Sequence, residues 1–221
     1  TPDMKCFKDV AKFFFKVAGM PYLRANRVTT LHFVFDDTRN QTGAKSLVQR
    51  ERDGDVRVQE NDAVGSIGPI SGTLLTPPRP ADWRNLLKNR TSKRKLITYL
   101  CDTLGDVGFE HLQDSNVGGR LKSIVVEGAC EDNRARLTKR VYNRSLNRVV
   151  TSELVDTYRN KHAEADTAIF LHAKYCGESD VLVVSFDTDV LFIGLVAQLD
   201  IETNNLGSNR GDKTNLRQLY L

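Results

Sequence analysis

The chain has 221 residues, a net charge of +4 and a pI near 8.9, a mildly basic balance that is compatible with a polyanionic partner. Hydrophobic residues make up 40% of it, enough for an ordinary core, and the 27% that are charged are too mixed in sign for wholesale disorder. Because no apolar run reaches the ~20 residues of a membrane span and the N-terminus lacks a signal-peptide core, we expect an intracellular protein without a membrane partner.

The first part of the chain alternates helical and extended patterns. Apolar residues at helical spacing predict a helix over 6–18, and the short apolar run Leu31–Phe35 predicts a buried strand that ends at Asp36. A basic helix is expected over 42–52. An irregular insertion is expected over 53–82, where Gly, Pro, Asp and Ser accumulate.

The second part continues the alternation. It predicts, in order, a helix over 83–104, a strand over 123–126, helices over 134–153 and 163–175, a strand over 181–186 and a helix over 190–199. The strands are continuous apolar runs, as in sheets that are buried on both faces. We therefore expect a single α/β domain of three layers, with a mainly parallel central sheet and helices on both faces.

Acidic residues follow two of these strands and open one helix. The acids that we place in one cleft are Asp36, Glu164, Asp166, Asp187 and Asp189. Chemistry in open parallel sheets lies beyond the carboxyl ends of the strands, so these side chains are expected to converge. Acids packed together repel one another, and a divalent cation with hard oxygen ligands, Mg²⁺ or Mn²⁺, removes that repulsion. Each acid alone also fits a solvated turn or a helix cap.

Basic residues suggest a second kind of contact. Four arginines spaced by four residues form one stripe on the expected helix over 134–153, namely Arg136, Arg140, Arg144 and Arg148. A row of arginines matches a phosphate backbone, although a solvated helix face is the alternative. The basic run Lys88–Lys95 is typical of a phosphate patch or a nuclear-import signal, which favours the nucleus over the cytoplasm.

Two blocks of the chain are similar to known nucleases. The stretch HAEADTAIFLHAKYCGESDVLVVSFDTDVLFIG, residues 162–194, resembles the internal motif of flap endonucleases and other structure-specific 5′ nucleases of the PIN-like superfamily. In that motif an acid pair opens a helix, and a second acid pair follows a strand. The earlier stretch LHFVFDDTRNQTGAKSLVQRER, residues 31–52, resembles the family's strand that ends in an aspartate before a basic helix. Within residues 162–194, the EADT and DTDV segments are most similar to those of multi-copy PIN-like proteins of animal genomes.

The resemblance implies a metal-dependent nuclease that hydrolyses phosphodiester bonds of DNA or RNA. It implies that the five acids hold two Mg²⁺ or Mn²⁺ ions and that Arg50 contacts phosphate. Gly43 stands at the family's other basic position, and Lys45, two residues away, is expected to take that role. Residues 1–221 then form a single PIN-like nuclease domain that lacks the family's first strand, with its ligand aspartate, and the family's C-terminal DNA-binding part.

Two alternatives stay open. The missing first aspartate is compatible with a degenerate PIN-like module that binds nucleic acid or protein without cutting it. A haloacid-dehalogenase-type phosphatase also carries Asp-x-Asp after an apolar strand, with Asp187 as nucleophile. Leu191 stands where that class has Thr or Val, which disfavours this second alternative.

Overall fold

The structure is a computed structural model. It describes residues 4, 6–25, 28–36, 90–113, 120–128, 134–142, 148–159, 165–176, 180–185, 189–190, 193–194 and 215–220. The helices are α1 (Phe7–Ala18), α2 (Met20–Ala25), α5 (Arg90–Gln113) and α6 (Ala165–Tyr175). The strands are β1 (Thr30–Val34), β2 (Ser123–Glu127), β3 (Ala135–Tyr142), β4 (Arg148–Val155), β5 (Asp180–Ser185) and β6 (Asn215–Tyr220).

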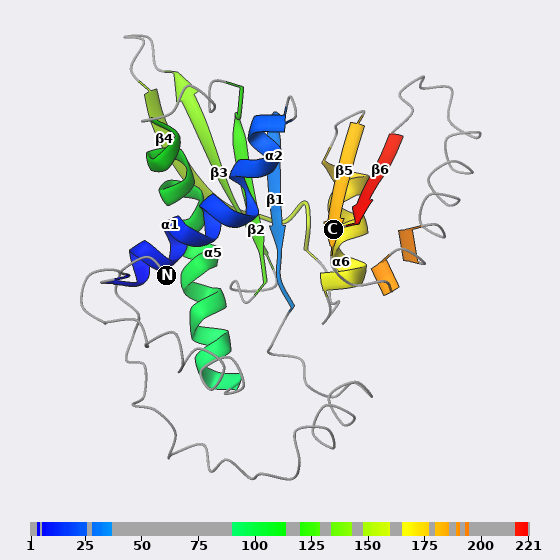
Figure 1. Ribbon diagram of the computed structural model, residues 1–221, viewed down its shortest axis with the longest axis horizontal. Helices are drawn as coiled ribbons and strands as arrows, with labels where there is room; N and C mark the ends of the chain where they lie inside the picture. Colours follow the sequence, from blue (N-terminus) through cyan, green and yellow to red (C-terminus); the bar gives the residue numbers. More distant parts are fainter. Residues whose placement is uncertain are drawn as a thin grey trace.

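The strands form two sheets in the described part of the chain. One sheet has the order β1-β2-β3-β4, in which β1 and β2 are parallel and the other two pairs are antiparallel. The other sheet is the parallel pair of β5 and β6. Parallel strands need a crossover connection, and α5 lies on the connection between β1 and β2 (Figure 1). The fold is therefore mixed α/β.

The main core lies between α1, α5 and one face of the four-stranded sheet. Helix α1 buries the side on which Phe7, Ala11 and Phe15 recur, which is the spacing of an amphipathic helix. Side chains alternate between the two faces of a strand. Phe33 of β1 and Ile124 of β2 accordingly point into this core, together with buried residues of α5.

Helix α5 comes unusually close to the sheet at Gly105. A Cβ atom built on this glycine would lie 2.0 Å from Oγ1 of Thr138, a buried residue of β3. Only a residue without a side chain permits such an approach. Gly105 therefore sets the distance between α5 and β3.

Most of the predicted elements are confirmed. The expected helices over 6–18 and 163–175 correspond to α1 and α6, and the expected strands correspond to β1, β2 and β5. The helix expected over 83–104 corresponds to α5, which begins at Arg90 and extends to Gln113. The expectations for 42–52 and 53–82 lie outside the described residues, as does most of 190–199. Among the described helices, none has the length and apolar character needed to cross a membrane.

The helix predicted over 134–153 is wrong, because this segment contains the antiparallel strands β3 and β4. Residues four apart share a face on a strand as well as on a helix, since four is twice the strand period. The run Arg148–Val155 is rich in β-branched residues, which favour strands. The hairpin also makes the four-stranded sheet mainly antiparallel, in contrast to the mainly parallel sheet expected.

Candidate functional site

The end of β1 and the start of α6 meet at Asp36. The backbone N–H of Ala165, the first residue of α6, donates a hydrogen bond of 3.1 Å to Oδ1 of Asp36. Nζ of Lys93 lies 3.7 Å from Oδ2 of the same carboxylate. The acid thus caps α6 from a distant part of the chain. This hydrogen bond places the end of β1 beside the start of α6.

Among the other predicted acids, Asp166 and Asp189 are described. Asp166 stands in the first turn of α6, one residue after Ala165, and Asp189 is exposed. Glu164 and Asp187 lie outside the described residues, as do Lys45, Arg50 and Arg144. Within the described ranges no group of three or more His, Cys, Asp or Glu is placed to hold a metal ion. The full ligand set therefore stays a prediction.

Strands β1 and β5, which precede acids that were expected to converge, belong to different sheets. Figure 1 shows them running in the same direction, and α6 contacts both. On the side of β5, apolar contacts join Phe170 of α6 to Val183 of β5 and to Val190. Helix α6, rather than a shared hydrogen-bonded ladder, therefore connects the two strands that precede the predicted acids.

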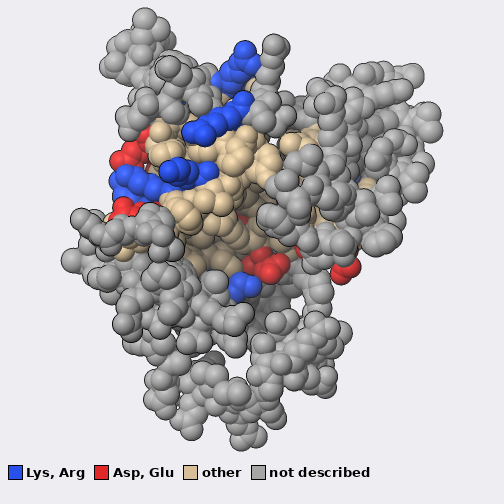
Figure 2. All heavy atoms as spheres, in the orientation of Figure 1, with Lys and Arg blue, Asp and Glu red and all other residues tan. Residues whose placement is uncertain are grey.

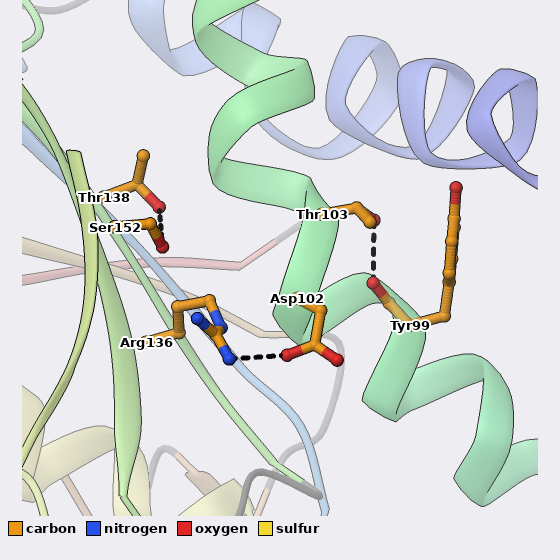
Figure 3. A network of polar contacts seen from close by, with 6 residues as sticks. All are labelled: Tyr99, Asp102, Thr103, Arg136, Thr138 and Ser152. Carbon is orange, nitrogen blue, oxygen red and sulfur yellow. Dashed lines mark hydrogen bonds and ion pairs between the residues drawn. The ribbon is translucent and has the colours of Figure 1, made fainter. Parts of the chain in front are cut away.

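Three arginines of the predicted stripe, Arg136, Arg140 and Arg148, lie on strands. Arg136 and Arg140 share the face of β3 that looks toward α5. Nη2 of Arg136 lies 2.8 Å from Oδ1 of Asp102 (Figure 3), and the guanidinium of Arg140 stacks over the ring of Phe109 at 4.8 Å from its centroid. Arg148 opens β4. The first two side chains thus contribute to packing against α5, and a role in nucleic-acid binding stays a prediction.

Basic side chains gather elsewhere on the surface. Figure 2 shows Lys and Arg over the part of the view that α1 and α2 occupy in Figure 1. Helix α1 carries Lys8, Lys12 and Lys16 at intervals of four residues, and α2 carries Arg24. Lys8 is paired with Glu110 at 2.8 Å, whereas Lys16 and Arg24 are exposed. This surface, the α1–α2 basic surface, suits a polyanion.

Sequence reasoning missed a chain of buried polar side chains on the other face of the sheet. His172 of α6 is only 3% exposed, and its Nε2 donates to Oε2 of Glu127 at the end of β2. Its Nδ1 lies 2.8 Å from Nδ1 of His32 on β1. The ring of Tyr158 stacks on His172, with 4.3 Å between centroids and 3° between planes, and meets His32 edge-on. We call these four residues the Glu-His-His-Tyr cluster.

The electrostatics of this cluster favour neutral imidazole at one position. Burial, and in second place the neighbouring His172, lowers the pKa of His32 from 6.5 to about 3. Nε2 of His32 is buried and has no hydrogen-bond partner in the described part of the chain. The only hint in the sequence is a histidine inside an apolar strand, LHFVF.

In comparisons with protein-family models, curated proteins and solved structures, nothing matches this chain.

Proposed function

We propose that this protein is a divalent-metal-dependent nuclease that hydrolyses phosphodiester bonds of DNA or RNA, in the manner of flap endonucleases. The observation that carries the proposal is the hydrogen bond from Ala165 to Asp36. It supports the proposal because it joins the two sequence blocks, 31–52 and 162–194, on which the resemblance rests. The finer architecture that we infer is PIN-like, with α1 and α5 on one face of the sheet and α6 on the other.

The donors suit a hard divalent cation. Asp36 is about half exposed, and within the described residues its Oδ2 faces Nζ of Lys93 at 3.7 Å, a lysine that is itself partly exposed. Asp166 follows in the first turn of the helix that Asp36 caps. Carboxylate oxygens are the ligands that Mg²⁺ and Mn²⁺ prefer. We infer that the site is completed by Glu164, Asp187 and Asp189.

A divalent cation bound there would supply a polarised phosphate and a water of lowered pKa. The chain's own residues provide the frame for this chemistry. Asp36 ties the end of β1 to the start of α6, so that ligands approach from two elements. Lys93, beside Asp36, brings a positive charge to the same edge. Lys45 and Arg50 are inferred to hold the phosphate backbone.

A second candidate is a PIN-like module that binds nucleic acid without cutting it. Asp36 already accepts an N–H and faces Lys93, so its charge is balanced without a cation. A carboxylate at a helix start is also favourable for the helix dipole alone. In this alternative the α1–α2 basic surface would bind the strand and the acids would be structural.

Titration with Mn²⁺ and cleavage of labelled flap, single-stranded and duplex substrates separate the two candidates. The nuclease proposal expects metal-dependent cleavage by the wild type, and its loss in Asp36→Asn and Asp166→Asn. Asp102→Asn is the matched control, because Asp102 pairs with Arg136 away from this edge. Salt-dependent binding without any cleavage supports the binding module, and the absence of both sinks both candidates.

A further inference from the structure

The Glu-His-His-Tyr cluster joins four separate elements of the fold. His32 comes from β1, Glu127 from the end of β2 and His172 from the last turn of α6, and Tyr158 follows β4. The contacts between His172 and its two partners cross from the helix to the sheet. The cluster is therefore a polar anchor for α6 on the sheet face opposite α5.

The contacts restrain both imidazole rings of the cluster. A carboxylate accepts, so Nε2–H of His172 donates to Glu127. Nδ1 of the same ring lies 2.8 Å from Nδ1 of His32, so that one of these two nitrogens donates and the other accepts. A further proton on this contact would set two N–H groups against each other. The two contacts therefore hold each imidazole in one orientation.

Helix α6 has a second polar anchor at its start. Asp36 accepts the N–H of Ala165, and His172 lies seven residues further along the same helix, which is about 10 Å at 1.5 Å per residue. Two anchors at this separation fix both the position and the direction of a helix axis. His172 is nearly fully buried and stacked on Tyr158, so its anchor restrains rotation of the helix as well.

We propose that Glu127, His172 and His32 are positioning residues, which hold α6 on the sheet so that its acidic start stays against the end of β1. This inference rests on the proposed function, because the end of β1 carries Asp36 and the start of α6 carries Asp166. None of the three positioning residues needs to touch a substrate or an ion. Their effect passes through the helix to Ala165 and to the residue that follows it.

The test reads the alignment directly, in the metal-free full-length protein. Hydrogen exchange of the Ala165 amide, followed by NMR, reports whether its bond to Asp36 is formed. His172→Leu removes both hydrogen bonds of the ring, and we expect this amide to exchange faster by roughly tenfold or more. His172→Gln keeps a donor near the position of Nε2, and we expect it to restore most of the protection.

Amides of α5 serve as the internal reference, and His111→Leu, which removes a histidine from α5, is the matched control. Should His172→Leu fail to fold, Glu127→Gln weakens the same chain from its other end and is read in the same way. Unchanged exchange at Ala165 overturns the proposal. So does faster exchange that is equal in α5 and α6, because that reports general destabilisation.

Mn²⁺ titration of the same variants separates this proposal from the proposed function. Weaker Mn²⁺ binding in His172→Leu, restored in His172→Gln, is expected. If the wild type binds no Mn²⁺, the nuclease proposal falls, and exchange at Ala165 still decides whether the positioning residues act as proposed.

Discussion

The stability of the protein should fall on mild acidification because of one buried histidine. Burial, with the nearby ring of His172 as the second cause, lowers the pKa of His32 from 6.5 to about 3 in the folded protein. The unfolded chain therefore binds this proton more tightly than the folded protein does. The contribution of His32 to stability is fully present above pH 6.5 and shrinks as the pH falls from 6.5 toward 3.

The size of the effect follows from the difference between the two pKa values. At pH 5, the unfolded histidine is almost fully protonated while folded His32 is still neutral. This lies 1.5 pH units below the unfolded value, and since each unit is worth about 1.36 kcal/mol, the loss relative to pH 7 is about 2 kcal/mol. That is a large fraction of the stability of a typical domain.

Urea unfolding at pH 7, 6 and 5 measures this loss in the wild type and in His32→Asn. Asparagine places its amide near the position of Nδ1, so it can form a hydrogen bond with His172 without titrating. The variant should lose about 2 kcal/mol less than the wild type between pH 7 and pH 5. His111→Phe is the control and should keep the full loss. Equal losses in the wild type and His32→Asn would refute the assignment of a neutral buried histidine.

Three further changes have expected outcomes. Gly105→Ala should lower the free energy of unfolding by about 1–3 kcal/mol in urea denaturation, because its Cβ would lie 2.0 Å from Oγ1 of Thr138; an unchanged midpoint contradicts the close approach of α5 to β3. Asp102→Asn should cost less than about 1 kcal/mol in the same assay, since its ion pair is partly exposed. Replacing Lys12 and Lys16 by Glu should weaken the binding of single-stranded nucleic acid and reduce the salt dependence of that binding, measured by fluorescence anisotropy. The control Lys174→Glu, on α6, should leave the binding unchanged.

The elements that the sequence predicted well are those whose pattern allows one geometry. The run over β1 is apolar, short and closed by an acid, and the apolar positions of α1 recur at helical spacing. Local pattern and tertiary burial agree at these places. The β3–β4 hairpin was missed because the arginine spacing fits both a helix and a strand. There, the cross-strand partners decide, such as Leu137 opposite Val125.

The residues of the candidate site could be predicted only where they stand next to a predicted strand or helix in the sequence. Acids that directly follow a strand or begin a helix can be recognised in the sequence, and the hydrogen bond between Ala165 and Asp36 is consistent with such a placement. The Glu-His-His-Tyr cluster has no such signal. His32 and His172 are 140 residues apart, and Glu127 and His172 are 45 apart. Only the packing of α6 on the sheet brings these side chains together.

The capping role of Asp36 and its proposed role as a metal ligand are compatible, because they use different oxygens. Oδ1 accepts the N–H of Ala165, and this hydrogen bond orients the carboxylate without neutralising its charge. Oδ2 faces Lys93 at 3.7 Å, with both side chains substantially exposed. Such a pair is worth at most about 1 kcal/mol, so a divalent cation could displace the ammonium group at little cost. The ammonium group of Lys93 would then be available to bind a phosphate. Asp36 would hold the start of α6 in place both before and after a cation binds.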